Sequence, residues 1–152
     1  MDVYARLKEL NLNLPDFPSK GAGINIPVRQ VGNCLYVSGQ VASLNGAPVF
    51  PGKLGANVTV EQGQEAARAC ALNALSRLHG FLGDLNKIKC LVKALGFVHS
   101  ADGFTEQPQV INGASALLQD IWGDNGVGTR SAIGVAGLPG GVSVEIEFIF
   151  EI

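Results

Sequence analysis

The chain has 152 residues, which is enough for one domain with a full hydrophobic core. Its net charge of −2 and its 11 basic residues give no basic patch of the kind that nucleic-acid-binding proteins use. Charged residues make up only 16 % of the chain, against roughly 25 % in a typical soluble protein. Low charge fits a chain that buries surface against copies of itself, because interface cores are poor in charge; a compact monomer with an uncharged polar surface is the alternative.

The opening residues carry charges throughout and lack an apolar core segment, so they do not predict a signal peptide. No stretch reaches the roughly 18 apolar residues of a membrane span. The cysteines Cys34, Cys70 and Cys90 lack the C-x-x-C spacing of a metal site, and each lies in an apolar run. We therefore expect buried free thiols and a reducing, cytoplasmic location.

The N-terminal third is predicted to hold one helix and two short strands. Apolar residues at helical spacing predict a helix over 3–12, and the Pro- and Gly-rich residues after it extend this segment into an arm, 1–22 in all. Strands are predicted over Val28–Val31 and Cys34–Val37, on either side of a tight turn. A loop follows over 41–58.

Two longer helices and a buried strand are predicted in the middle of the chain. Thr59 can cap a helix, and Gln62 completes a capping box; this helix should end near Gly80–Gly83. The β-branched and apolar run Ile88–Val98 predicts a buried strand. A second helix is predicted over Pro108–Ile121, with the proline acceptable in its first turn.

The order of these elements predicts an α+β fold. Strand–helix–strand units place two helices on one face of a mixed sheet, with the short N-terminal helix in addition. No repeat or linker interrupts the chain, so residues 1–152 are predicted to be a single domain. Because the strands are apolar almost throughout, we expect a neighbouring subunit to cover the other face.

Near the C-terminus, two β-rich runs flank a turn over Leu138–Gly141. If the runs pair as adjacent strands, Arg130 and Glu145 fall near the same end of the pair, beside apolar neighbours. A guanidinium and a carboxylate in such a place form either a structural ion pair or a site. Arginine offers a planar fork that suits a ligand carboxylate, and glutamate can hold or activate a water.

Several motifs occur in a characteristic order: Tyr36-Val37-Ser38-Gly39-Gln40, Val110-Ile111-Asn112-Gly113, Arg130-Ser131, Leu138-Pro139 and Val144-Glu145-Ile146-Glu147. On these motifs the chain resembles the RidA/YjgF family, also called the L-PSP endoribonuclease or perchloric-acid-soluble protein family, from about residue 25 to the end. The N-terminal helix and the glycine-rich segment before Arg130 resemble a longer, divergent branch. The resemblance implies a chorismate-mutase-like fold and a homotrimeric barrel with three clefts between subunits, without a metal or an organic cofactor.

The best-known members of that family hydrolyse reactive enamines and imines, such as 2-aminoacrylate and 2-iminobutanoate, to 2-keto acids and ammonia. By resemblance, Arg130 matches the arginine that binds the substrate carboxylate, and Glu145 matches the glutamate that positions the hydrolytic water. Ser38 and Asn112 match residues of the ligand pocket. The chain departs from the pattern at two positions: Asn25 stands where the family has a pocket tyrosine, and Ala132 where it has a small thiol.

Each of these residues also has a structural interpretation. Arg130 can be the partner of a core carboxylate, and Glu145 can be a strand residue that faces solvent, like Glu147. Ser38 can be a turn former and Asn112 a helix-packing residue, while His79 and His99 are expected to be surface or satisfied histidines.

Three functions therefore stay open: an imine/enamine deaminase, a trimeric binder of small carboxylates without efficient chemistry, and a ribonuclease. The missing pocket tyrosine favours the binder, and the missing basic patch weighs against the ribonuclease. The expected partners are a small carboxylate-bearing ligand and further copies of the chain, with neither nucleic acid nor a membrane.

Overall fold

A computed structural model describes residues 2–16 and 23–152; residues 17–22, in the predicted arm, lie outside the described residues. Five strands form one sheet, a two-stranded hairpin stands apart from it, and two long helices pack on the sheet. The elements in chain order are α1 (Val3–Glu9), β1 (Val28–Val31), β2 (Cys34–Val41), β3 (Ser43–Leu44), β4 (Ala47–Pro48), α2 (Val60–Leu82), η1 (Leu85–Lys87), β5 (Cys90–His99), α3 (Gln107–Trp122), η2 (Gly123–Gly126), β6 (Thr129–Val135), η3 (Pro139–Gly141) and β7 (Val144–Glu151).

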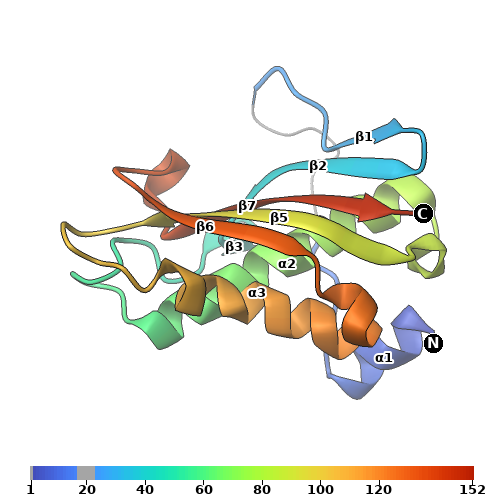
Figure 1. The fold of residues 1–152 in the computed structure, drawn as a ribbon, viewed down its shortest axis with the longest axis horizontal. Coiled ribbons are helices and arrows are strands. Elements are labelled where there is room, and N and C mark those ends of the chain that lie inside the picture. Colours follow the sequence, from blue (N-terminus) through green and yellow to red (C-terminus); the bar gives the residue numbers. More distant parts are fainter. Residues whose placement is uncertain (1, 17–22) are drawn as a thin grey trace.

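The sheet has the strand order β1-β2-β7-β5-β6, in which β5 and β6 run parallel and the other neighbours antiparallel. Helices α2 and α3 lie side by side across one face of it, and α1 packs at one end of the helical layer (Figure 1). The predicted mixed sheet with two helices on one face and a short N-terminal helix is therefore confirmed. The described residues include no helix that is both long and apolar enough to cross a membrane.

Helix α2 begins and ends where its local sequence predicts. The Thr59 hydroxyl accepts a hydrogen bond from the Gln62 N–H (3.2 Å), and the Gln62 side chain accepts one from the Thr59 N–H (3.0 Å), which completes the capping box. Gly83 ends the helix in the left-handed conformation (φ 73°). In α3, Gly113 packs so closely on α2 that a Cβ at this position would overlap the Gln64 carbonyl.

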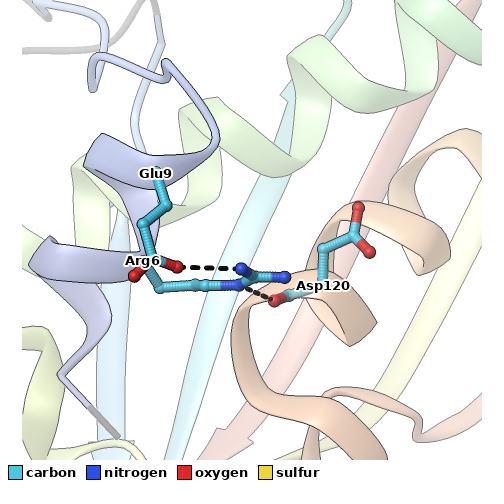
Figure 2. Close-up of polar contacts among 3 residues, drawn as sticks. All are labelled: Arg6, Glu9 and Asp120. Atoms are coloured by element: carbon cyan, nitrogen blue, oxygen red, sulfur yellow. Dashed lines mark hydrogen bonds and ion pairs between the residues drawn. The ribbon is translucent and has the colours of Figure 1, made fainter.

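Helix α1 is attached to the helical layer by burial and by one charged side chain. Leu7 is 4 % exposed. Figure 2 shows Arg6 between the two helices: its Nε donates to the Asp120 carbonyl of α3 (2.7 Å), and its Nη1 pairs with Glu9 of α1 (2.9 Å). The helix ends at Glu9, short of the predicted residue 12, because the backbone at Asn11 takes the left-handed conformation (φ 54°).

The expected pairing of the two C-terminal strands is wrong. Strand β6 pairs in parallel with β5, and β7 pairs with the other side of β5, so that β5 lies between them. In this register Arg130 lies opposite Ala94, whereas Glu145 lies opposite Phe97. The residues 136–143 do not form a hairpin because they cross the end of β5, where the His99 N–H donates to the Ser143 carbonyl.

Strand β2 runs further than predicted, to Val41, and carries a β-bulge. Its register with β7 shifts between Val37 and Gln40, which leaves Ser38 and Gly39 in the bulge. Strand β1 pairs with β2 only as far as Val37, so no strand of the described residues lies beside the outer edge of β2 beyond that residue.

The sheet face opposite the helices has little cover from the described residues. Tyr36 and Ile133 on this face are 46 % and 45 % exposed. The prediction that all cysteines are buried is correct only for Cys70; Cys34 and Cys90 are half-buried, because they begin β2 and β5 at the end of the open face.

Candidate functional site

Glu145 lies on strand β7 and points away from the helices. Its neighbours Val144 and Ile146 are fully buried on the helix side, and side chains alternate along a strand. Burial raises the pKa of the Glu145 carboxyl above its ordinary value, and the negative charge of Glu147 acts in the same direction. Glu145 is thus half-buried while Glu147 is exposed, although both face the same side.

The bulge in β2 makes room for the Glu145 carboxyl. An ideal Cβ built on Gly39 would lie 2.7 Å from Oε1 of Glu145, so only glycine leaves this carboxyl its position. Beside it, the Ser38 hydroxyl donates to the Ile26 carbonyl (2.6 Å) and the Ser38 N–H to the Pro27 carbonyl (3.0 Å). Ser38 therefore ties the chain before β1 to the bulge, and its hydroxyl oxygen keeps lone pairs to accept a hydrogen bond from a ligand.

Glu145 and Ser38 share one cavity of about 400 Å³ at the open edge of β2. Polar side chains and apolar surface both contribute to its lining, which is formed by Asn25, Pro27, Ser38, Gly39, Gln40, Val41, Ser43, Asn73, Arg77, Pro139 and Glu145.

Asn73 and Arg77 of α2 also line this cavity, although no sequence motif points to them. The Asn73 amide donates to the Val41 carbonyl (3.0 Å) and to the Ser43 carbonyl (2.7 Å), which fixes α2 against the end of β2. A signal for Asn73 was present in the sequence, because it is a polar residue on the otherwise apolar face of α2. In the structure its side chain is only 1 % exposed.

Arg130 lies in a different place, on the edge strand β6 against α3. Its Nη1 donates to Oδ1 of Asn112 (2.8 Å) and to the Ser115 hydroxyl (3.1 Å), two side chains three residues apart on one face of α3. These bonds leave Nε and Nη2, which form one edge of the planar fork, for a ligand carboxylate. Asn112 thus orients the Arg130 side chain from a position on α3, beside the candidate ligand pocket.

Arg130 is not the partner of a core carboxylate in this chain. Within residues 2–16 and 23–152, the one salt bridge joins Arg6 and Glu9. A groove of about 440 Å³ lies along the Arg130 side chain, and its lining includes Asn112, Ser115 and Gln119 of α3. The guanidinium is therefore held by neutral partners at the rim of a hollow.

The two pairs of candidate residues do not meet within one chain. Arg130 bonds to α3 on the helix side of the sheet, whereas Glu145 faces the other side. They are two strand spacings apart, about 10 Å, and three residues apart along the strands, about another 10 Å. The structure joins Ser38 and Asn25 to Glu145, and Asn112 to Arg130; Ala132 lies two residues after Arg130 on the same strand.

Neither histidine belongs to these two groups. His79 Nδ1 shares a hydrogen bond with the Tyr4 hydroxyl (2.9 Å), as expected of a satisfied histidine. His99, at the end of β5, is half-buried, and its buried Nδ1 has no hydrogen-bond partner among the described residues. In the described part of the chain, no three His, Cys, Asp or Glu side chains gather closely enough to hold a metal ion.

Comparisons with known proteins agree with this architecture. Residues 4–146 match the family described as "YjgF/chorismate_mutase-like, putative endoribonuclease". Protein TCP17 of Trypanosoma cruzi is 41 % identical over 151 residues, which are 99 % of this chain and 94 % of that protein.

Two crystal structures are similar over nearly their whole length. Atu1372 of Agrobacterium tumefaciens, described as a protein of unknown function, has a TM-score of 0.90 and 43 % identity, covering 99 % of this chain and 92 % of that one. A Shewanella oneidensis MR-1 protein with the same endoribonuclease description has a TM-score of 0.95 and 30 % identity, covering both chains completely. The chain therefore belongs to the YjgF/chorismate mutase-like family and has that family's α+β fold.

Proposed function

We propose that this protein hydrolyses small reactive imines and enamines of the 2-aminoacrylate or 2-iminobutanoate type to 2-keto acids and ammonia, at a site that two subunits of a homotrimer complete. The observation that carries the proposal is the content of the two hollows. One holds a half-buried carboxyl group with a raised pKa, and the other holds an arginine whose fork has an open edge. Together they supply a water-activating base and a carboxylate anchor.

Arg130 binds the substrate. A 2-imino acid has a carboxylate next to an electrophilic C=N carbon, and Nε and Nη2 of Arg130 donate two parallel hydrogen bonds to that carboxylate. Asn112 and Ser115 hold the opposite side of the guanidinium, so the fork is oriented before the substrate arrives. A fixed carboxylate places the imine carbon for attack and removes part of the entropic barrier.

Glu145 activates the water. Its carboxylate accepts a proton as the water oxygen attacks the imine carbon, and the electron pair of the C=N bond moves to nitrogen, which takes up a proton. In the resulting carbinolamine a proton moves from the hydroxyl to the amino nitrogen, the C=O bond forms, and the C–N bond breaks to release the keto acid and ammonia. A base with a raised pKa is better matched to proton transfer near neutral pH, and such a group typically contributes about 100- to 10,000-fold.

The trimer brings the two hollows together. The proposal is supported by the low charge content, by the uncovered sheet face with the exposed Tyr36 and Ile133, and by the separation of Arg130 from Glu145. Sedimentation at micromolar concentration should give about three times the chain mass of 15.8 kDa. A monomer that hydrolyses imines would contradict the composite site.

Variants of Glu145 and Arg130 test the proposed base and the proposed carboxylate anchor separately, with assembly measured as a check on folding. Glu145→Gln should retain 2-keto acid binding but lose at least about tenfold in hydrolysis of freshly generated 2-iminobutanoate, measured above the rate without protein. Glu147→Gln, on the same strand but exposed, is the matched control and should remain active. Arg130→Ala should lose keto-acid binding while the trimer persists, and Arg130→Lys should recover little, because a point charge cannot replace the fork.

If wild type binds keto acids but does not exceed the spontaneous rate, the protein is a small-carboxylate binder. The family description also names endoribonuclease activity, but 11 basic residues and a net charge of −2 offer little to bind a phosphate backbone, so we place RNA cleavage below both.

A further inference from the structure

The groove along Arg130 continues past the guanidinium, over surface that the hydrolysis described above does not use. Asn112 and Ser115 of α3 bond to Arg130, and Ala116 and Gln119 line the groove further along the same helix. These four positions lie on one side of α3, because they follow Asn112 at helical spacing. At about 1.5 Å per residue, the groove extends about 6 Å beyond Ser115. It is therefore longer than a bound carboxylate needs, and the arginine fixes one end of it.

Small residues of the sheet make room for this groove. Ala94 of β5 lies opposite Arg130 in the strand register and is 4 % exposed, so a methyl group forms the floor beside the arginine. Gly128 lies so close to β5 that an ideal Cβ built on it would be 2.7 Å from the Leu91 carbonyl oxygen. The chain before β6 can approach β5 in this way only with glycine, and the hollow between β6 and α3 results from that approach.

The surface that the groove exposes is mainly apolar. Leu91 and Ala116 form parts of its wall together with Val127, an aliphatic side chain that is 54 % exposed. The Thr129 hydroxyl, which also lines the groove, already donates to the Val92 carbonyl (2.8 Å). An alkyl group here would gain about fourfold in affinity for each methylene it buries, whereas a charged group would lose hydration.

The volume of the groove admits a branched alkyl group. The keto acid 4-methyl-2-oxopentanoate has nine heavy atoms and, at about 30 Å³ for each water-sized group, fills about 270 Å³ of the available 440 Å³. Pyruvate has six heavy atoms, and on the same basis it leaves more than half of the groove empty. The groove is thus better filled by the larger ligand.

We propose that the groove beyond Arg130 holds the side chain of the substrate, so that the preferred substrates are 2-imino acids with branched alkyl side chains rather than the smaller three- and four-carbon compounds. In this arrangement the Arg130 fork binds the α-carboxylate and the alkyl group lies over Ala94, between Ala116 and Val127. The imine carbon stays at the rim, within reach of the water that Glu145 of a neighbouring subunit activates. The inference rests on the proposed function, because it takes Arg130 and Glu145 in the roles given there.

Three keto acids separate the size of the side chain from its polarity. Pyruvate has a methyl group, 4-methyl-2-oxopentanoate has an isobutyl group, and 2-oxosuccinate has nearly the shape of the latter but ends in a carboxylate. By calorimetry with freshly dissolved ligands, wild type should bind 4-methyl-2-oxopentanoate at least about tenfold more tightly than either of the others, because three further carbons are partly buried.

Ala116→Leu tests the place of the side chain. Ala116 is exposed on α3, so leucine can be accommodated by the fold and would fill the groove. The preference for 4-methyl-2-oxopentanoate over pyruvate should fall below about threefold. Ala56→Leu, the same change at an exposed alanine outside the groove, is the matched control and should keep the preference. Val127→Thr, which keeps the branched shape, should reduce the preference by about twofold to fourfold and serves as the test if Ala116→Leu does not fold.

Equal wild-type affinity for pyruvate and 4-methyl-2-oxopentanoate would overturn the inference and leave the proposed function standing. Tighter binding of 2-oxosuccinate would also overturn it, because the side chain would then meet a polar site. An unchanged preference in folded Ala116→Leu, or in Val127→Thr, would show that the alkyl group binds elsewhere. Binding of none of the three keto acids by wild type would defeat the proposed function, and the role of the groove with it.

Discussion

Replacing Gly39 by alanine tests whether the exact position of the Glu145 carboxyl matters. The backbone at Gly39 does not require glycine, since its φ lies outside the left-handed region. The new Cβ would lie 2.7 Å from Oε1 of Glu145, and ordinary van der Waals contact begins at 3.4 Å. The carboxyl oxygen must therefore move by about 0.7 Å, the difference between these two distances.

This displacement should cost activity and little stability. The atom that must move is the far end of a half-buried, flexible side chain, so we expect the free energy of unfolding to change by less than about 1 kcal/mol. For a domain of this size, that change corresponds to a shift of at most a few degrees in melting temperature. A misplacement approaching 1 Å can cost about 100-fold in rate. We expect imine hydrolysis to fall about 10- to 100-fold in Gly39→Ala, measured as the initial rate above the spontaneous reaction.

The control is Gly137→Ala, because a Cβ at Gly137 would meet no atom within 4 Å and its φ also lies outside the left-handed region. It should match wild type in both rate and melting temperature. In a Glu145→Gln background, Gly39→Ala should add little, since both changes act on the same carboxyl. Full activity in Gly39→Ala would refute the argument that this bulge positions the base.

Three further outcomes are expected. Gly113→Ala should destabilise the fold by about 1–3 kcal/mol in thermal unfolding, since the new Cβ overlaps the backbone of α2, whereas Gly80→Ala, with open space around it, should be neutral or stabilise by up to about 1 kcal/mol. Because the folded-state pKa of Glu145 is raised above 4.5, the stability contributed by its protonated form is fully present below that pH and is lost as pH rises through the folded-state pKa. In denaturant unfolding, Glu145→Gln should therefore be at least as stable as wild type at pH 7, and the difference should vanish in acid. Hydrolysis by wild type should slow as pH falls through the same range, because the base becomes protonated. Arg6→Ala should cost at most about 1 kcal/mol, because its ion pair is on the surface, but Leu7→Ala, which empties a buried position of α1, should cost about 2–5 kcal/mol in the same measurement.

Local signals predicted the helices well. The capping box at Thr59 and the glycine at the end of α2 act within a few residues of the sequence, so their effect does not depend on the rest of the fold. The order of the last two strands was not predictable in this way. A proline and two glycines after Leu138 signal a change of direction, but they do not say whether the chain returns beside β6 or crosses β5.

The same limit explains which residues of the candidate site carried no signal in the sequence. Motifs identified Ser38, Asn112, Arg130 and Glu145. They did not show that Ser38 and Glu145 lie in one hollow and Asn112 and Arg130 in another. Arg77 has no motif, and only the packing of α2 on the end of β2 brings it into the cavity with Glu145. Long-range placement of this kind is fixed by tertiary contacts that no short window of sequence contains.

Each candidate side chain is positioned by a different local feature of the fold. A bulge with a glycine makes room for Glu145, and the i and i+3 residues of one helix face orient Arg130. An asparagine amide fixes the helix that carries Arg77. These features lie on both sides of the sheet, so a single protomer can be fully folded and still hold only separate halves of the proposed site. Under the proposed function, assembly is therefore part of the catalytic apparatus, because contact between protomers is what would place the arginine fork opposite the carboxyl proposed to activate water.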